Sequence, residues 1–359
     1  MRVLAAMSGG VDSAVAAALL KEQGWDVVGV TMLLHENDEG RLRPDGRGCC
    51  GSQAVRDARR VAARLAIPHY VWDLRREFEA AVIQDFCHEY AQGRTPNPCI
   101  RCNDRVKFGV MLERGRQLGA THIATGHHAR VEQIGGRWYL RAGNDKDKDQ
   151  SYFLYTMAQE QMGQVLMPVG NLTKSEVRDI ARRYRLPVAQ KPESQEVCFV
   201  PEGDHVSFLK KRQPELFRPG PVLDMKGQVL GRHQGAVGFT VGQRKGLGLA
   251  FGERMYVARV DVAANAVVLG TGREVRGRVV EAADARWTSG REPESPIRVH
   301  AKVRYRSTGG SALVEPLPDR RCRVTFDKPQ WAPTPGQAVV FWLGDSVLGG
   351  GTIESWRRE

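Results

Sequence analysis

The sequence contains no apolar run long enough to cross a membrane, since such a helix needs about 20 consecutive apolar residues. The first residues, MRVLAAMSGG, are too short for the hydrophobic region of a signal peptide, because two glycines and then Asp12 end the apolar stretch. We therefore expect a cytoplasmic protein. The chain shows no internal repeat and no low-complexity segment, and its 359 residues predict two or three globular domains.

Cysteine is scarce and irregularly spaced. The cysteines are Cys49, Cys50, Cys87, Cys99, Cys102, Cys198 and Cys322. Their odd number in a long chain argues against a secreted disulfide scaffold. A zinc site made of two close cysteine pairs has only weak support, because Cys99 and Cys102 have no second pair at matching spacing. The segment TPNPCIRC (95–102) therefore leaves open a metal site, a redox pair or half of a reaction.

Acidic residues are outnumbered, because 41 Asp and Glu face 53 Lys and Arg, which gives a net charge of +12. A codon bias toward arginine would explain the choice of arginine over lysine, but not the excess of bases over acids. A large positive surplus favours a polyanionic partner, because each neutralised phosphate releases counterions. Charge alone therefore favours a nucleic-acid partner.

Strand-like and helix-like segments alternate as far as Glu202. The expected strands are 2–6, 26–34, 69–74 and 122–127, and the expected helices are 13–24, 52–67, 76–93, 104–119 and 172–186. This rhythm predicts an α/β domain with a parallel sheet covered on both faces, and ligands beyond the carboxyl ends of its strands. Beyond Glu202, short glycine-rich strands dominate.

Three domains follow from this change of character. We expect an α/β catalytic domain over 1–202, a small β-rich linker domain over 203–274 and a C-terminal β-barrel-like domain over 275–359. Two local signals refine the first domain. Thr173 and Glu176 have capping-box spacing at the start of a helix, and GGRWYLRAG (135–143) has the pattern of a hairpin.

The segment AMSGGVDS lies between the first strand and the first helix. Gly9 and Gly10 would let the backbone approach a phosphate, Ser8 and Ser13 offer hydroxyls, and the start of the helix directs N–H groups at an anion. The loop lacks the Gly-Lys-Ser/Thr ending of a P-loop and the spacing of the dinucleotide fingerprint. The residues alone leave a phosphate site and an ordinary Gly-Gly turn equally open.

The wording SGGVDS resembles the signature of the PP-loop ATP pyrophosphatase superfamily, whose domain is adenine nucleotide alpha hydrolase-like. Members attach AMP from ATP to a substrate oxygen, release pyrophosphate and let a nucleophile displace AMP. The resemblance implies that ATP and Mg²⁺ are cofactors, and that Asp12 helps to hold Mg²⁺ or to orient the phosphates. The implied ATP-binding residues are Ala6, Met7, Ser8, Gly9, Gly10, Val11, Asp12, Ser13, Met32 and Gly126.

Two cysteine segments, GRTPNPCIRCNDRVKFG (93–109) and SQEVCFV (194–200), resemble the bacterial and organellar tRNA-specific 2-thiouridylases. GCCGSQAVRDARRVA, ATGHHAR, DKDQSYFL, LTKSEVR, FTVGQRKGLG and LGGGTIE follow in the order of that family, so the resemblance spans almost the whole chain. It implies an ATP-dependent tRNA-uridine 2-sulfurtransferase. Such an enzyme adenylates the C2 oxygen of the wobble uridine and replaces that oxygen with sulfur.

The resemblance implies that Cys102 is the nucleophile and that Cys198 carries the sulfur as a persulfide. That persulfide either attacks directly or is reduced by Cys102, which leaves a Cys102–Cys198 disulfide for an external reductant. The neighbouring charges of Arg94, Arg101 and Lys107 are expected to favour the thiolate form of Cys102.

Cys99 leaves a second mechanism open. Several relatives carry aspartate at this position, where it could serve as an acid or base, so the acid/base role is unassigned here. Cys99, Cys102 and Cys198 could instead hold three irons of a 4Fe–4S cluster whose fourth iron binds sulfide. Cys49 and Cys50 receive no role.

The same resemblance implies the RNA contacts. Asn97, Pro98 and Cys99 would lie against the target base, and the tRNA contacts would be His127, Lys148, Asp149, Gln150, Arg304, Tyr305, Arg306 and Gln337. The expected partners are tRNAs for Lys, Glu and Gln and a persulfide donor such as a cysteine desulfurase or a sulfur-relay protein. Two rivals stay open, an amide-forming synthetase of the same superfamily and a non-catalytic RNA-binding protein.

Overall fold

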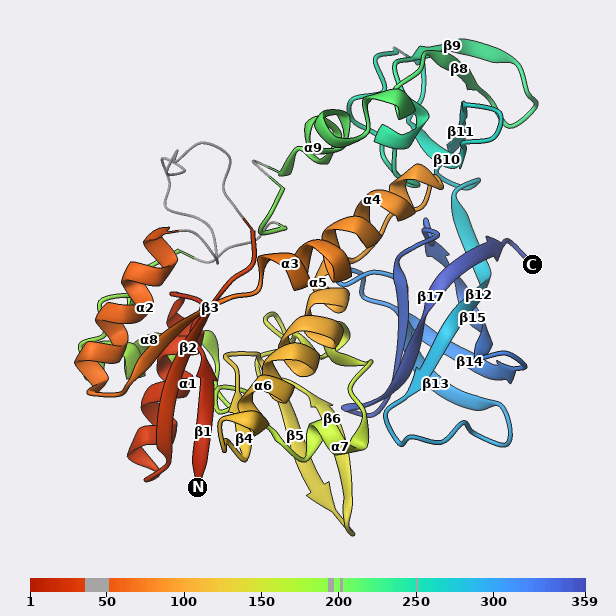
Figure 1. Cartoon of the computed structure of the whole chain (residues 1–359). Coiled ribbons are helices and arrows are strands. Elements are labelled where there is room, and N and C mark those ends of the chain that lie inside the picture. The colour runs from red at the N-terminus through yellow and green to blue at the C-terminus, as the bar shows by residue number, and fades with distance from the viewer. Residues whose placement is uncertain (36–51, 193–196, 201–202, 250) are drawn as a thin grey trace.

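The computed structural model describes residues 1–35, 52–192, 197–200, 203–249 and 251–359. The chain forms a parallel-sheet part, a middle β-rich part and a C-terminal barrel, in that order (Figure 1). Cys49 and Cys50 lie outside the described residues. Among the residues described, no helix is long and apolar enough to cross a membrane.

The first part is built on a parallel sheet, as predicted. Its strands are β1 (Arg2–Ala6), β2 (Asp26–Leu33), β3 (His69–Asp73), β4 (His122–Ala124) and β7 (Val165–Leu166), in the order β3-β2-β1-β4-β7. Successive side chains of a strand point to opposite faces. Leu4 accordingly enters one core, whereas Val3 and Ala5 enter another. The sheet is therefore buried on both faces.

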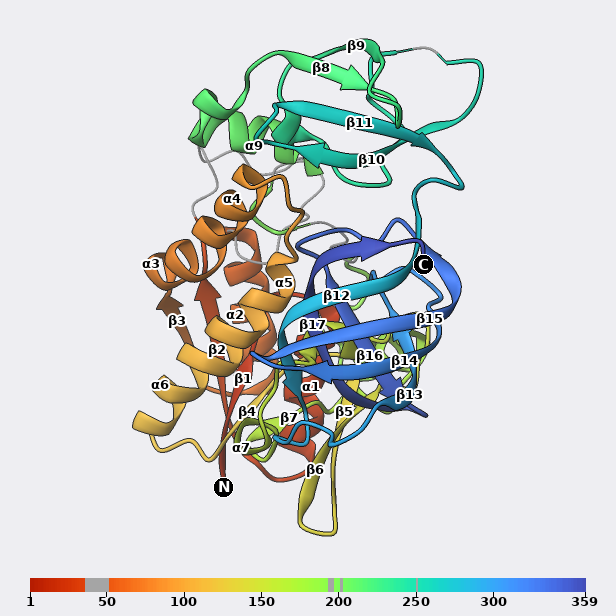
Figure 2. The ribbon, with the colours of Figure 1, turned by 90° about the vertical axis from the view of Figure 1, so that its right-hand side faces the viewer.

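Helices cover both faces of this sheet (Figures 1 and 2). One face carries α1 (Val11–Glu22), α2 (Ser52–Leu65) and α8 (Lys174–Arg183), and the other carries α3 (Arg75–Phe78), η2 (Glu79–Ile83), α4 (Gln84–Ala91), α5 (Pro98–Arg101), η3 (Cys102–Val110) and α6 (Met111–Gln117). The helices expected at 76–93 and 104–119 are present, but each contains a π-helical stretch, η2 or η3. Such stretches are rare and frequently occur at functional sites.

A hairpin leaves the first part and joins the barrel. It consists of β5 (Ala129–Ile134) and β6 (Arg137–Ala142), where the sequence predicted a hairpin. Arg141 of β6 pairs with Ser346 of the barrel, and Arg130 and Arg141 each contact the carboxylate of Asp345 at 2.6 Å. η4 (Ser151–Leu154) and α7 (Gln159–Met162) follow in the chain. The hairpin thus ties the parallel-sheet part to the C-terminal part.

The middle part has a short helical entry and a four-stranded sheet. Its elements are α9 (His205–Arg212), η6 (Pro214–Leu216), β8 (Gly220–Leu223), β9 (Val229–His233), η7 (Ala236–Gly238), β10 (Met255–Asp261) and β11 (Ala266–Thr271). The sheet order is β10-β11-β8-β9, and its core contains Val222, Val257 and Leu269.

The C-terminal part is a closed β-barrel, as predicted. Its strands are β12 (Arg276–Trp287), β13 (Ile297–Lys302), β14 (Gly310–Leu317), β15 (Arg321–Trp331), β16 (Ala338–Leu343) and β17 (Ser346–Arg357). They run in the order β12-β15-β14-β13-β16-β17, and β17 pairs again with β12. This pairing leaves the barrel without a free edge (Figure 2).

Candidate active site

The loop between β1 and α1 has the features of an anion site. Gly9 has a φ of +70°, and a Cβ there would lie 2.5 Å from the carbonyl oxygen of Ala54. Glycine is therefore required for this turn. Gly10 precedes α1 and has no side chain to cap it, so the first N–H groups of the helix remain available to a ligand. Ser8 is exposed at the mouth of the loop.

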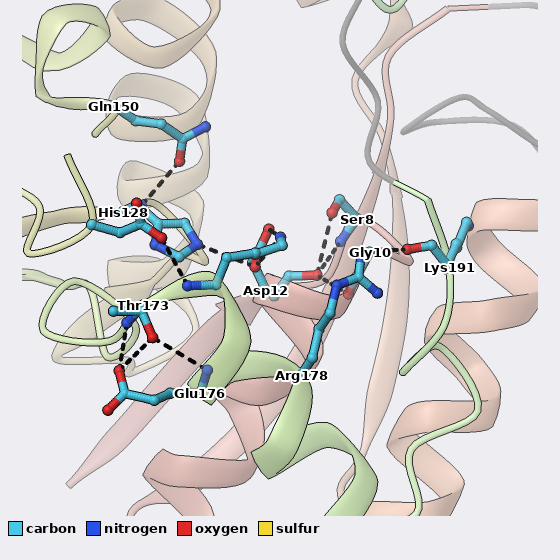
Figure 3. Close-up of polar contacts among 12 residues, drawn as sticks. Ser8, Gly10, Asp12, His128, Gln150, Thr173, Glu176, Arg178 and Lys191 are labelled. Atoms are coloured by element: carbon cyan, nitrogen blue, oxygen red, sulfur yellow. Dashed lines mark hydrogen bonds and ion pairs between the residues drawn. The ribbon is translucent and has the colours of Figure 1, made fainter. Parts of the chain in front are cut away.

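Asp12, in the first turn of α1, is bonded to two cations or potential cations (Figure 3). Lys174 Nζ lies 2.7 and 2.8 Å from its two carboxylate oxygens, and His128 Nε2 lies 3.2 Å from one of them. Burial opposes ionisation of Asp12, but the His128 hydrogen bond and the charge of Lys174 outweigh it and lower the pKa. The ionised carboxylate suits a hard cation such as Mg²⁺, which would share it with Lys174.

A second lysine reaches the same loop from the segment that precedes Cys198. Lys191 Nζ donates to the carbonyl oxygen of Gly9 at 3.0 Å and contacts Asp57 of α2 at 2.7 Å. The guanidinium of Arg178, on α8, donates to the carbonyl oxygens of Ala189 and Lys191 and so fixes this segment (Figure 3). Two lysines from distant segments therefore converge on the loop.

Sequence reasoning assigned no role to either lysine. Lys174 nevertheless carried a local signal, because it is the first residue of α8, where the helix dipole disfavours a cation. The predicted capping box is present beside it, with the Thr173 hydroxyl accepting from Glu176 N and the Glu176 carboxylate accepting from Thr173 N. Lys191 carried no such signal.

The other predicted ATP residues lie at the carboxyl edge of the sheet. Met7 follows β1, and its carbonyl oxygen accepts a hydrogen bond from Thr31 Oγ1 at 2.8 Å. Met32 lies near the end of β2 and is buried. Gly126 follows β4 and packs so closely on α1 that a Cβ would lie 2.5 Å from Ser13 N. The structure thus brings the loop and Gly126 together, with Met32 on the neighbouring strand.

The predicted target-base residues lie at the start of α5, which continues directly into η3. Because α5 carries Cys99 and η3 carries Cys102, we call the two together the cysteine helix. Asn97 caps α5 by accepting a hydrogen bond from Ile100 N at 3.4 Å, and Pro98 occupies the first turn. Cys99 is exposed, whereas Cys102, at the start of η3, is buried. A small pocket borders this helix, lined among others by Asn97, Arg101 and Tyr155 and by Gly336, Ala338 and Thr352 of the barrel.

Cys102 and Cys198 are far apart in sequence but share one hydrophobic cluster. Cys102 belongs to the largest core cluster of the chain, and the half-buried Cys198 packs against it together with its neighbour Val197. Phe199 lies in the same cluster and contacts Phe86 of α4 with ring centroids 5.1 Å apart. The Cys198 segment is therefore held on the face of the sheet that carries the Cys102 helix.

The cations expected to act on Cys102 have acidic or polar partners. Arg94 contacts Glu89 at 2.8 Å, and Lys107 donates to Asn103 Oδ1 at 2.9 Å. Arg101 lies 3.4 Å from Asp85. The same helix also reaches the barrel, because Arg286 of β12 lies 3.5 Å from Asp104. The Arg101–Asp85 and Arg286–Asp104 pairs thus connect the cysteine helix to α4 and to the barrel.

The three cysteines do not form an iron–sulfur ligand set. Within the described parts of the chain, no three His, Cys, Asp or Glu side chains are grouped so that they could hold a metal ion. Cys99 points to the surface, while Cys102 lies in the core. The structure therefore does not favour the cluster alternative.

Comparison with known proteins covers nearly the whole chain. Residues 1–202 match the family model described as "tRNA methyl transferase HUP domain", 206–271 match a "tRNA methyl transferase PRC-barrel domain" and 278–353 an "Aminomethyltransferase beta-barrel domain". The tRNA-specific 2-thiouridylase MnmA of Moorella thermoacetica is 51% identical over 98% of this chain and 99% of its own. The chain belongs to the tRNA-specific 2-thiouridylase family. The family resemblance predicted from the sequence is confirmed.

Another relative and two solved structures extend the comparison. The 2-thiouridylase of Pelotomaculum thermopropionicum is 50% identical over 99% of this chain and 97% of its own. A 4-thiouridine synthetase–RNA complex with bound ATP is 17% identical over 60% of this chain and 50% of its own, with a TM-score of 0.37. The NMN synthetase of Francisella tularensis is 19% identical over 53% and 64%, with a TM-score of 0.31. The likeness to these two structures is too slight to inform function.

Most of the residues that the thiouridylase resemblance assigned to tRNA are engaged within the protein. His127 is buried, with Nδ1 2.7 Å from Thr125 Oγ1, and burial, together with the charge of Lys107, holds its pKa well below the usual value. The carboxylate of Asp149 accepts from Gly143 N and Ser151 N, and Gln150 Oε1 accepts from His128 N. Lys148 precedes them and is half-buried.

Of the four residues assigned to tRNA in the barrel, three are half-buried and one is exposed. Arg304 is half-buried and donates to the carbonyl oxygens of Val241 and Ala332 at 2.6 and 2.9 Å. The ring of Tyr305 lies 4.4 Å from that of Phe153. Arg306 is exposed. Gln337, the remaining residue of the set, donates to two carbonyl oxygens of the segment that precedes the cysteine helix.

Proposed function

We propose that this protein catalyses the ATP-dependent 2-thiolation of the wobble uridine of tRNA, as a tRNA-uridine 2-sulfurtransferase. The observation that carries the proposal is about 50% identity to tRNA-specific 2-thiouridylases over nearly the whole length of both chains. A glycine-rich loop at a helix start and two cysteines on one core cluster are the parts that this reaction needs. Family membership does not favour an amide-forming synthetase.

The first half of the reaction would take place at the loop between β1 and α1. ATP would place its phosphates against Ser8, Gly9, Gly10 and Ser13, where the start of α1 and Lys191 offset their charge. Mg²⁺, held by Asp12, would neutralise further phosphate charge. The C2 oxygen of the uridine attacks the α-phosphorus, pyrophosphate leaves, and C2 then carries AMP as a leaving group.

The second half would use Cys198 and Cys102. The terminal sulfur of the Cys198 persulfide attacks C2 and expels AMP, which leaves C2 joined to Cys198 through two sulfurs. The Cys102 thiolate then attacks Cys198 Sγ, the electrons of the broken S–S bond remain on the 2-thio group, and a Cys102–Cys198 disulfide forms. An external thiol reductant reopens that disulfide. Support for this relay comes from the packing of both cysteines against one core.

The anticodon loop would supply the substrate base. A base in a single-stranded loop leaves its stack at low cost, and Asn97, Pro98 and Cys99 are proposed to receive it. The net charge of +12 supports phosphate contacts, and the exposed Arg306 offers one of them. The tRNAs for Lys, Glu and Gln, a persulfide-donating protein and a cytoplasmic location stay predictions, as do the domain boundaries after residues 202 and 274.

A direct assay tests the function. Purified protein, ATP, Mg²⁺, a persulfide donor and unmodified tRNA are incubated, and the digested nucleosides are analysed by mass spectrometry. We expect 2-thiouridine to appear together with AMP and pyrophosphate. The absence of any 2-thio nucleoside with tRNAs for Lys, Glu and Gln, each tested separately, would contradict the proposal.

A further inference from the structure

Three parts of the chain meet at the segment that leads into the cysteine helix. The side-chain amide of Gln337, in the barrel, donates to the carbonyl oxygens of Thr95 and Pro96 at 2.9 and 3.0 Å. Thr95 N donates to the carbonyl oxygen of Pro335 at 2.8 Å. Thr95 Oγ1 lies 3.3 Å from Thr240 Oγ1 in the middle part. The segment is therefore bonded on both sides by other parts of the molecule.

The backbones approach closely at this point. Gly336 has a φ of +89°, and a Cβ there would lie 2.9 Å from three backbone atoms of Thr95. Only glycine accepts both the conformation and the contact. Gln337 is itself aligned by the barrel, because its backbone N–H donates to the carbonyl oxygen of Thr334 and Ile353 N donates to its carbonyl oxygen. The amide of Gln337 is thus fixed where it meets the two carbonyl groups.

Arg304 joins the two outer parts of this junction. Its guanidinium donates to the carbonyl oxygen of Val241, which follows Thr240 in the chain, and to that of Ala332, three residues before Pro335. Thr334 also contacts the same guanidinium. The segment around Thr240 and the segment before Pro335, which both bond to Thr95, are therefore also joined to each other through Arg304.

We propose that Gln337 is a positioning residue, which holds the Thr95–Pro96 segment and through it sets the placement of the helix that carries Cys99 and Cys102. The expected effect on catalysis rests on the thiolation function proposed above, whereas the hydrogen bonds of Gln337 do not depend on it. The two carbonyl groups lie directly before Asn97, which caps α5, so a shift of the segment moves the cap and the cysteine helix together. The Gln337 amide donates to these two carbonyl oxygens in the folded chain.

The test compares Gln337→Met with Gln330→Met. Methionine has nearly the size of glutamine but no N–H donor. Gln330, also in the barrel, donates to the carbonyl oxygen of Lys328 within its own strand and is the matched control. Gln337→Lys restores a side-chain N–H donor and is the rescue variant. Without tRNA, iodoacetamide labels each protein, and peptide mapping follows the alkylation of Cys102, with the buried Cys87 as internal reference.

We expect Gln337→Met to raise the alkylation rate of Cys102 relative to Cys87 by on the order of fivefold, because the segment opens locally more often. Gln330→Met leaves the ratio unchanged, and Gln337→Lys lowers it again. In the thiolation assay, kcat of Gln337→Met falls while its Kd for tRNA stays within about twofold of the parent. If Gln337→Met does not fold, Gly336→Ala disturbs the same contact and has the same expected effect.

An unchanged Cys102 ratio in Gln337→Met would overturn the proposal. A weaker Kd for tRNA with an unchanged ratio would do so as well, because it would make Gln337 a tRNA contact. The labelling experiment needs neither tRNA nor ATP, so its result stands even if the parent protein forms no 2-thiouridine. Failure of the proposed function and failure of the positioning role are therefore seen in different measurements.

Discussion

The loop between β1 and α1 and the cysteine helix differ in which parts of the chain hold them in place. The loop is a run of consecutive residues between β1 and α1, and one domain supplies its neighbours Ala54, Gly126, Lys174 and Lys191. The cysteine helix is fixed by the barrel and the middle part through Gln337, Arg286 and Thr240. The proposed ATP chemistry thus needs contacts within the parallel-sheet part alone, whereas the proposed sulfur chemistry needs all three parts of the chain to be assembled.

The largest effect is expected from the two cysteines, whose substitution should abolish sulfur transfer and leave ATP binding intact. We expect Cys102→Ser and Cys198→Ser each to reduce 2-thiouridine formation by at least about a thousandfold, because a hydroxyl can neither carry a persulfide nor close a disulfide. ATP binding stays intact in both, since the loop between β1 and α1 is untouched. Nucleoside mass spectrometry and calorimetric ATP titration measure the two outcomes. Cys87→Ser, on α4, is the control and keeps its activity. Activity above about a tenth of the parent in either variant would contradict the relay.

A substitution on the nucleotide side reverses the pattern. Gly126→Ala would place a Cβ 2.5 Å from Ser13 N and push the start of α1, with the loop that precedes it, away from residue 126. We expect a cost of about 2 kcal/mol, which corresponds to roughly thirtyfold weaker ATP binding. The Cys102 alkylation rate stays as in the parent. Gly252→Ala, where a Cβ meets nothing within 4 Å, is the control for isothermal titration calorimetry. Equal ATP affinity in the two variants would show that the contact is not needed.

Lys174 sharpens the comparison at the level of one ion pair. Lys174→Met removes the cation bound to Asp12, and we expect ATP affinity to fall by on the order of tenfold, since a charge-assisted bond near the phosphates is lost. Lys174→Arg should retain most of the affinity. Arg183→Gln, an exposed position on the same helix, serves as the control. Titration with a non-hydrolysable ATP analogue gives the values, and an unchanged Kd for Lys174→Met would refute the assignment.

The smallest effect concerns His127, which the parallel-sheet part buries. Its pKa is lowered in the folded protein, so between that pKa and the usual 6.5 the unfolded chain binds more protons than the folded one. The free energy of unfolding is therefore unaffected by His127 above about pH 6.5 and decreases as the pH falls further. We expect His127→Gln to flatten the decline between pH 7 and pH 5 by about 1 kcal/mol in urea unfolding. The exposed His88→Gln leaves the slope unchanged, and an equal slope in both variants would contradict this account.

Much of the fold could be predicted because its signals are local. Strands β1 to β4 and helices α1, α2 and α8 were predicted from apolar runs and from the Thr173–Glu176 capping box, and they are present. The two-residue strand β7 was not predicted. The loop between β1 and α1 could be predicted as an anion site, because its glycines, its hydroxyls and the helix start are consecutive in the sequence. Such features need no knowledge of distant contacts.

Features that depend on distant contacts could not be predicted. The π-helical stretch that begins at Cys102 has no residue signature, because a widened turn is set by packing. Lys191 and Gln337 act on backbone carbonyl groups, which every residue has, so no pattern of side chains indicates the partner. His127 in ATGHH was assigned to tRNA, but it is buried and its ring lies 5.9 Å from that of Phe108 in the core.

The pairing of the β5–β6 hairpin with β17 has a consequence for biosynthesis. The hairpin emerges from the ribosome long before Asp345 and Ser346, its partners in the barrel. Until Asp345 has been synthesised, the guanidinium groups of Arg130 and Arg141 remain solvated. The barrel cannot close until β17 pairs with β12. A nascent chain that stalls before β17 would therefore present a complete β1–α1 loop, while the barrel that carries Gln337 and Arg286 beside the cysteine helix is still open.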